Sequence, residues 1–212
     1  MTSKRFPGKV LATFLNRPLL DHVVQQIKKS KIFSSIILAT STDNTDNPLA
    51  SYAKELDLKV VRGSLDNVVE RYALALDSYN CDAFFRVCGD SPLLLPSLFD
   101  YAVSIYRDKR YDVITNIFPR TFPVGMSVEL IKTEAFLKLK KNILSQEEKE
   151  HLSKYFYNNF SNFKIFNIEC NSPIDQNLKL AVDKYDDLEK IESWLSDKKD
   201  KFENLFPIKI SK

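Results

Sequence analysis

The 212-residue chain carries 31 basic and 28 acidic residues spread along its length, for a formal net charge of +3. Because the basic residues form no patch or stripe, the composition excludes the electrostatic signature of a nucleic-acid-binding domain. A hydrophobic content of 44% with 28% charged residues is typical of a globular domain and excludes a disordered chain.

No apolar run approaches the roughly 18 residues that a membrane-spanning helix needs, and Met1 is followed by polar and basic residues rather than by a signal sequence. The cysteines, Cys81, Cys88 and Cys170, lack metal-ligand spacing. We therefore expect free thiols in a reducing, cytoplasmic compartment, with no membrane or nucleic-acid partner.

Helix-like and strand-like hydrophobic patterns alternate along the chain, with short polar segments between them. In chain order, the patterns predict a helix over 18–29, a strand over 35–40, a helix over 48–56, a strand over 59–61, a helix over 66–79, a strand over 83–88, a helix over 96–106, a strand over 112–116, an extended segment over 121–131 interrupted at Gly125, helices over 133–141 and 146–158, strands over 164–168 and 178–182, and a closing helix that carries Leu188 to Leu195.

This alternation predicts an α/β fold: one three-layer, Rossmann-like domain over residues 1–212 with a mostly parallel central sheet. Such sheets bind ligands beyond the carboxyl ends of their strands. Four polar or glycine-bearing segments follow strand-like runs, and we expect them to meet at one edge: 40–43, 62–64, 89–91 and Asp183. The arrangement favours a nucleotide-sized anionic ligand with a metal ion.

The segment from Ser3 to Lys9 combines three cations, a hydroxyl group and a glycine. Such a loop can wrap a polyphosphate, because glycine lets backbone N–H groups approach while Lys and Arg neutralise charge. A solvated, frayed terminus is the alternative. Glycine is scarce, with four residues where average usage gives about 15, and all four lie in candidate site loops: Gly8, Gly63, Gly89 and Gly125.

Two aspartates are candidate metal ligands. Asp90 follows the strand-like run 83–88, and Asp183 follows the apolar run 178–182. Mg²⁺ prefers one or two carboxylates together with substrate phosphates and water. Alone, Asp90 is equally consistent with a cap of a turn or helix, but the pair favours a metal site.

Six strings lie along the chain in one order: Ser-x-Arg-x-Pro-Gly-Lys, Ala-Thr-Ser-Thr-Asp, Val-Arg-Gly-Ser-x-Asp-x-Val-x-x-Arg-Tyr, Arg-Val-x-Gly-Asp-x-Pro-Leu, Arg-Thr-Phe-Pro-x-Gly and Val-Asp-x-x-x-Asp-Leu. Together they resemble the CMP-sugar-acid synthetases, the acylneuraminate and ketodeoxyoctonate cytidylyltransferases, and most of all their spore-coat polysaccharide branch. The match runs through the whole chain in the same order.

The resemblance implies a nucleotide-diphospho-sugar transferase fold, transfer of CMP from CTP to a sugar or sugar acid, a Mg²⁺ cofactor and a homodimer that uses the extended segment around 118–131. It implies catalytic roles for Arg5, Lys9 and Asp90, and Mg²⁺ ligands at Asp90 and Asp183. The nucleotide-binding set that it implies is Ser3, Lys4, Arg5, Gly8, Lys9, Thr40, Ser41, Arg62, Gly63, Asp66, Arg71 and Gly89; the sugar-side set is Arg120, Thr121, Phe122, Gly125 and Glu129.

Two other functions stay open on the sequence. A glycosyltransferase of related fold also uses metal-binding aspartates, but it usually needs an Asp-x-Asp pair, which the sequence lacks. A truncated, inactive homologue that only binds nucleotide is the second, because the resemblance implies a further strand, ending in Gln-Ala-Arg, ahead of the basic loop. A parallel sheet without that central strand would leave backbone groups of its neighbours unpaired. Either the recorded start is set too late or the product is damaged.

Adding an upstream strand that ends in Gln-Ala-Arg is expected to raise both thermal stability and CTP affinity. Without that strand, we expect the loop over residues 1–8 to lack an N-terminal anchor, and ordering it would cost about 1–2 kcal/mol per residue in backbone entropy. Thermal melts and CTP titrations of the 212-residue chain and of the extended chain measure both effects. Equal stability and equal activity of the two would contradict this expectation.

Overall fold

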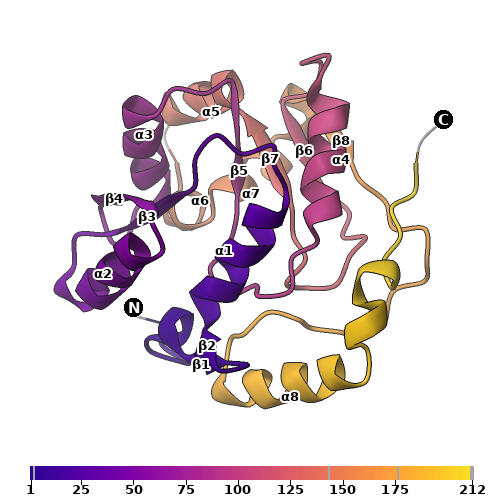
Figure 1. Ribbon diagram of the computed structural model, residues 1–212. Coiled ribbons are helices and arrows are strands. Elements are labelled where there is room, and N and C mark those ends of the chain that lie inside the picture. Colours follow the sequence, from indigo (N-terminus) through magenta and orange to yellow (C-terminus); the bar gives the residue numbers. More distant parts are fainter. Residues whose placement is uncertain (2, 143, 176, 211–212) are drawn as a thin grey trace.

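The computed structural model describes residues 1, 3–142, 144–175 and 177–210. Its helices lie on both sides of the strands (Figure 1), so the three-layer α/β prediction is confirmed. The helices are α1 (Leu19–Lys29), α2 (Asn47–Glu55), α3 (Val68–Ser78), α4 (Pro96–Tyr106), α5 (Thr133–Lys140), α6 (Gln146–Glu150), α7 (Leu152–Asn158) and α8 (Tyr185–Ser196), with 3₁₀ helices η1 (Lys9–Leu11), η2 (Asn44–Asp46), η3 (Phe160–Asn162) and η4 (Lys199–Asn204).

Alternate residues of two neighbouring strands enter different cores, which gives the domain its layers. Ile114 and Leu130 pack with α1 and α4 in one core, whereas their neighbours Val113 and Ile131 pack with α3, α5 and α7 in another. A third core joins α1 and α2 to the strands over residues 37–41 and 59–63. The strands are β1 (Thr13–Phe14), β2 (Arg17–Pro18), β3 (Ile37–Ser41), β4 (Lys59–Gly63), β5 (Ala83–Arg86), β6 (Val113–Thr115), β7 (Glu129–Lys132) and β8 (Ile165–Asn167).

The sheet differs from the mostly parallel one predicted. β3 and β4 form a parallel pair, and a separate four-stranded sheet has the order β5-β7-β6-β8. β8 is parallel to β6, but β7 runs antiparallel to both β5 and β6. The reason lies in the connection from β6 to β7: no helix crosses over there, so the chain returns in the opposite direction.

Element boundaries follow local signals closely. α4 begins at Pro96, at the helix position where a missing N–H costs nothing. The predicted helix over 146–158 is instead two helices that meet at His151, the first begun by a capping box at Ser145. The predicted strand over 178–182 is reduced to one parallel bridge between Val124 and Lys179.

Gly125 explains how the segment 178–182 lies so close to the chain before β7. Its φ is 102°, and a Cβ atom there would stand 2.3 Å from the carbonyl carbon of Leu180. The N–H of Leu180 donates to the carbonyl oxygen of Val124 at 2.6 Å. Only glycine allows this approach, and it places the chain that leads into Asp183 beside the segment 118–131.

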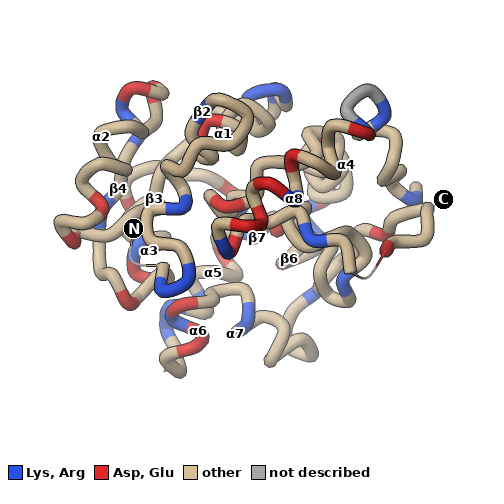
Figure 2. The backbone as a smooth tube through the Cα atoms, turned by 90° about the horizontal axis from the view of Figure 1, so that it is seen from below, with Lys and Arg blue, Asp and Glu red and all other residues tan. Residues whose placement is uncertain are grey.

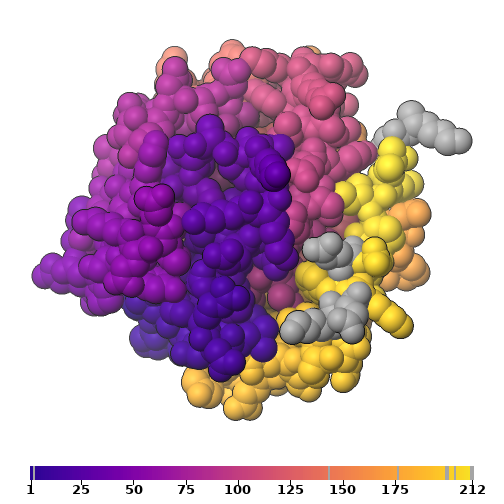
Figure 3. Space-filling model, viewed as in Figure 1, coloured from indigo at the N-terminus to yellow at the C-terminus, as the bar shows by residue number. Residues whose placement is uncertain are grey.

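A slot separates the β3–β4 pair from the four-stranded sheet. Within the described ranges, β3 pairs only with β4 and β5 only with β7, so the facing edges of β3 and β5 carry no ladder. Between them is a cavity of about 870 Å³, with α1 side chains such as Val23 and Ile27 on one wall and Tyr72 and Leu76 of α3 on the other. Figures 1 and 3 show the N-terminal residues through α1, in indigo, at the front of the molecule.

We expect the slot-facing amides of β3 and β5 to exchange with solvent deuterium faster than those of β6. β6 is paired on both sides, by β7 and β8, whereas β3 and β5 are each paired on one side, and an unpaired amide is less protected. Hydrogen–deuterium exchange resolved to single amides measures the difference. Equal protection in β5 and β6 would mean that the slot is closed in solution.

Candidate active site

The ammonium group of Lys9 brings the two predicted metal ligands together. Its Nζ atom donates to Asp90 Oδ2 at 2.7 Å, to Asp183 Oδ1 at 3.3 Å and to the carbonyl oxygen of Val182 at 2.9 Å. The N–H of Val182 in turn donates to the carbonyl oxygen of Asp90 at 2.9 Å. Two carboxylates from distant parts of the sequence therefore face one cationic group.

The rest of the basic loop surrounds this contact. Gly8, with a φ of 72°, turns the chain into η1, and the guanidinium of Arg5, which is 61% exposed, lies 3.0 Å from Asp183 Oδ1. Ser3 accepts a local hydrogen bond from the N–H of Phe6, and Lys4 is exposed. Figure 2 looks onto this end of the molecule and shows charges of both signs between the N-terminal segment and α8.

Asp183 is held as a carboxylate. Partial burial acts to raise its pKa, but hydrogen bonds from Lys179 and Lys9 outweigh burial and bring the pKa below its usual range. Lys179 Nζ lies 2.9 Å from Asp183 Oδ2 and equally 2.9 Å from Asp187 Oδ2. The Asp183 side chain thus uses one oxygen toward Lys9 and Arg5 and the other toward Lys179.

Asp187 anchors the backbone at the same place. Its Oδ2 accepts the N–H groups of Asp183 and Lys184 at 2.7 and 2.9 Å, ahead of α8. Burial acts to raise the pKa of Asp187, yet the Lys179 bond and these backbone bonds lower it to about 2. Asp187 is therefore charged at any physiological pH.

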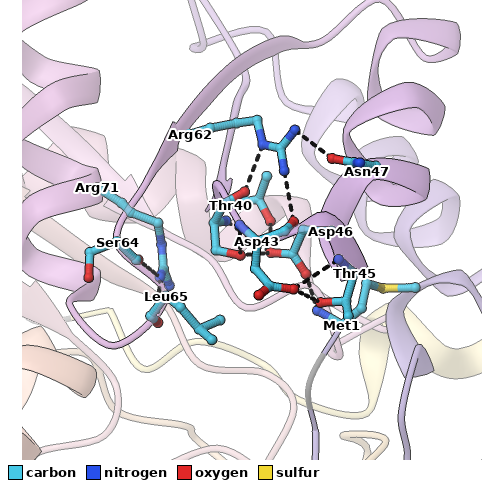
Figure 4. Close-up of polar contacts among 11 residues, drawn as sticks. Met1, Thr40, Asp43, Thr45, Asp46, Asn47, Arg62, Ser64, Leu65 and Arg71 are labelled. Atoms are coloured by element: carbon cyan, nitrogen blue, oxygen red, sulfur yellow. Dashed lines mark hydrogen bonds and ion pairs between the residues drawn. The ribbon is translucent and has the colours of Figure 1, made fainter.

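A second polar group lies at the carboxyl end of β3 and is built around Asp46, which is 4% exposed (Figure 4). Asp46 Oδ2 accepts from Thr40 Oγ1 at 2.6 Å and from the N–H and Oγ of Ser41 at 2.9 and 2.7 Å. Its Oδ1 pairs with the amino group of Met1, so the basic loop has an anchor at Met1, contrary to the expectation that it has none. The hydroxyl groups of Thr40 and Ser41, predicted to contact nucleotide, therefore point inward to a carboxylate.

Arg62 is likewise occupied within the protein. Its guanidinium donates to the carbonyl oxygens of Ser41 and Asp43 at 2.7 and 2.9 Å and to Asn47 Oδ1 at 2.8 Å (Figure 4). These bonds close the loop between β3 and α2. Each of the three guanidinium nitrogens of Arg62 therefore donates to a group of the protein itself.

The turn after β4 is packed tightly against α3. Arg71 donates through Nη1 to the carbonyl oxygens of Ser64 and Leu65, while its buried Nε has no hydrogen-bond partner among the described residues. A Cβ atom on Gly63 would come within 2.9 Å of Leu74 Cδ1. Asp66 is exposed beside this turn. On the other side of the slot, a Cβ on Gly89 would meet Val10 at 3.2 Å.

The sugar-side set divides into exposed and buried members. Arg120 is exposed and donates to Ser127 Oγ at 3.2 Å, while Thr121 holds the backbone through the carbonyl oxygens of Asn116 and Ile168. Phe122 and Glu129 are fully buried, and neither offers a surface to a ligand. Glu129 instead accepts from Arg86 Nη1 and from the Tyr157 hydroxyl, both at 2.7 Å.

Sequence reasoning assigned no role to Asp46, Lys179, Asp187 or Arg86. Arg86 and Asp187 stand inside the quoted strings, which is the signal that could have marked them. Asp46 and Lys179 act through partners that only the fold brings together. Among the described residues, no group of three or more His, Cys, Asp or Glu side chains is placed to hold a metal ion, and no helix is long and apolar enough to cross a membrane.

Comparison with known proteins places these features in a family. The chain is 32% identical over 167 residues to an uncharacterized protein of Methanocaldococcus jannaschii, covering 79% of this chain and 68% of that one. It is 25% identical to the spore coat polysaccharide biosynthesis protein SpsF of Bacillus subtilis, over 91% and 82% of the two chains.

The structural comparison agrees. A cytidylyltransferase from Leptospira borgpetersenii superposes with a TM-score of 0.86 at 31% identity, over 92% of this chain and 83% of that one. A CMP:2-keto-3-deoxy-manno-octonic acid synthetase complexed with CTP, at 16% identity and a TM-score of 0.68 over 92% and 95% of the chains, shares the fold. The family model described as cytidylyltransferase matches residues 1–207, and the chain therefore belongs to the cytidylyltransferase family.

Proposed function

We propose that the protein transfers CMP from CTP to a hydroxyl group of a sugar acid and releases pyrophosphate, as a step in the synthesis of a surface polysaccharide or glycoconjugate. The observation that carries this proposal is the meeting of Lys9, Asp90 and Asp183 at one point in a chain of the cytidylyltransferase family. Curated relatives named 3-deoxy-manno-octulosonate cytidylyltransferase, such as that of Bdellovibrio bacteriovorus, 30% identical over 133 residues, support the sugar acid.

The two aspartates suit a divalent cation. Asp90 Oδ2 and Asp183 Oδ1 both lie within 3.3 Å of one ammonium nitrogen, so they already face a common cation, and Mg²⁺ takes one or two carboxylates with substrate phosphates as further ligands. Asp90 and Asp183 would hold Mg²⁺, which when bound neutralises phosphate charge.

The protein side chains contribute charge and position. The hydroxyl oxygen of the sugar acid attacks the α-phosphorus of CTP. The bond between the α-phosphorus and the oxygen of the leaving pyrophosphate breaks, and the hydroxyl proton passes to a carboxylate or to water. Lys9 and Arg5 offset the negative charge of the phosphates, which is the main catalytic need of phosphoryl transfer. This assigns the catalytic roles to Arg5, Lys9 and Asp90.

The nucleotide would lie along the edge formed by the ends of β3, β4 and β5. Thr40, Ser41 and Arg62 would serve it by fixing the backbone of the edge, since their polar atoms are bound to Asp46, Ser41 and Asn47. The sugar acid would approach over the exposed Arg120. A homodimer through the segment around 118–131 and a cytoplasmic location complete the proposal.

Turnover is expected to be highest with CTP, because the family is built for cytidine transfer. Pyrophosphate release with CTP, UTP and ATP, each with a panel of ketosugar acids, measures the preference. Equal turnover with UTP or ATP would refute the assignment, and no turnover with any pair would favour the inactive nucleotide-binding homologue.

Asp90→Asn and Asp183→Asn should each lower turnover about a hundredfold or more, because each removes a charge that faces the cation site. Asp108→Asn, which removes a carboxylate from an exposed ion pair with Arg110, is the matched control and should keep full turnover. Circular dichroism checks that the variants fold. Near-normal activity of either site variant at low Mg²⁺ would show that the two-aspartate site is wrong.

A further inference from the structure

The carboxylate of Asp183 is presented to the candidate site by one oxygen. Oδ1 faces the site, where it meets Lys9 and Arg5 at 3.3 and 3.0 Å. Oδ2 faces away from these groups toward Lys179 at 2.9 Å. The carboxylate is only about a quarter exposed, so a fixed partner on Oδ2 also fixes the direction of Oδ1.

Lys179 is itself held from two sides. Its ammonium group bridges Asp183 Oδ2 and Asp187 Oδ2, both at 2.9 Å. Its backbone pairs with Val124, next to the close approach at Gly125. Asp187 meanwhile accepts the N–H of Asp183, so one carboxylate restrains both the backbone and the side chain of Asp183.

The geometry points to Lys179 and Asp187 as positioning residues that hold Asp183 so that it offers a single oxygen, Oδ1, to a divalent cation. This inference rests on the proposed function, in which Asp183 is a ligand of Mg²⁺. Neither residue touches the reacting atoms in this scheme; each acts through Asp183.

Charge alone does not explain a lysine at this place. A cation next to the ligand of a metal ion opposes metal binding by Coulomb repulsion, and Asp187 cancels that charge locally. What the Lys179–Asp187 pair contributes without net charge is direction. Groups that orient a metal ligand typically change metal affinity or activity by about 10–100-fold when they are removed.

The test is Mn²⁺ binding to the nucleotide-free protein, followed by electron paramagnetic resonance, together with kcat, KM and thermal melts. Lys179→Met should weaken Mn²⁺ binding by about 10–100-fold, whereas an effect of charge alone would tighten it. The double variant Lys179→Met/Asp187→Asn leaves the local net charge unchanged and should still bind weakly. Lys179→Arg, which keeps the cation and its donors, should bind within about threefold of the native protein.

Two references make the outcomes distinct. Lys209→Met, which breaks an exposed ion pair with Glu169, should change nothing, and melts within a few degrees of native exclude misfolding as the cause. Unchanged or tighter Mn²⁺ binding by Lys179→Met, or native binding by the double variant, would overturn the positioning role. Loss of Mn²⁺ binding in Asp183→Asn would at the same time support the metal site. If Asp183→Asn bound Mn²⁺ normally, the metal site and the positioning role would fall together.

Discussion

One ammonium group ties together the parts of the molecule on which the candidate site depends. Lys9 contacts the turn after β5 through Asp90 and the chain before α8 through Asp183 and Val182. Without Lys9, the two carboxylates would repel each other in a partly buried place. Among the described residues, no other cation pairs with both of them. The fold of the basic loop and the closeness of the two aspartates are therefore one electrostatic arrangement, not two.

Two other carboxylates are buried at the margins of the site and serve the framework. Asp46 accepts bonds from Thr40, Ser41 and Met1, and Glu129 accepts bonds from Arg86 and Tyr157. A buried charge is tolerated only when its oxygens are paired, and both carboxylates meet that condition. Asp46 fixes the end of β3, and Glu129 joins β5, β7 and α7.

The sequence was sufficient for the elements that depend on local signals. α4 starts at Pro96 as predicted, and Asp90 and Asp183 meet because both follow strands or strand-like segments that end at the same edge. The direction of side chains could not be predicted from the sequence. The hydroxyl groups of Thr40 and Ser41 can bind either a ligand or Asp46, and only the packed fold decides which of the two they bind. The antiparallel course of β7 was missed because periodicity gives the extent of a strand but not the direction of its partner.

The slot between β3 and β5 divides the domain into two bodies, one built on the β3–β4 pair and one on the four-stranded sheet. Among the described residues no backbone ladder crosses it, so the bodies are joined by the side chains of α1 and α3 and by connecting loops. Small sliding of packed elements is one of the ways in which parts of a protein move relative to each other. Asp46 and Arg62 lie on one body, and Asp90 and Glu129 on the other. A small shear along the slot would change the width of the candidate ligand-binding edge without breaking a hydrogen bond of either sheet.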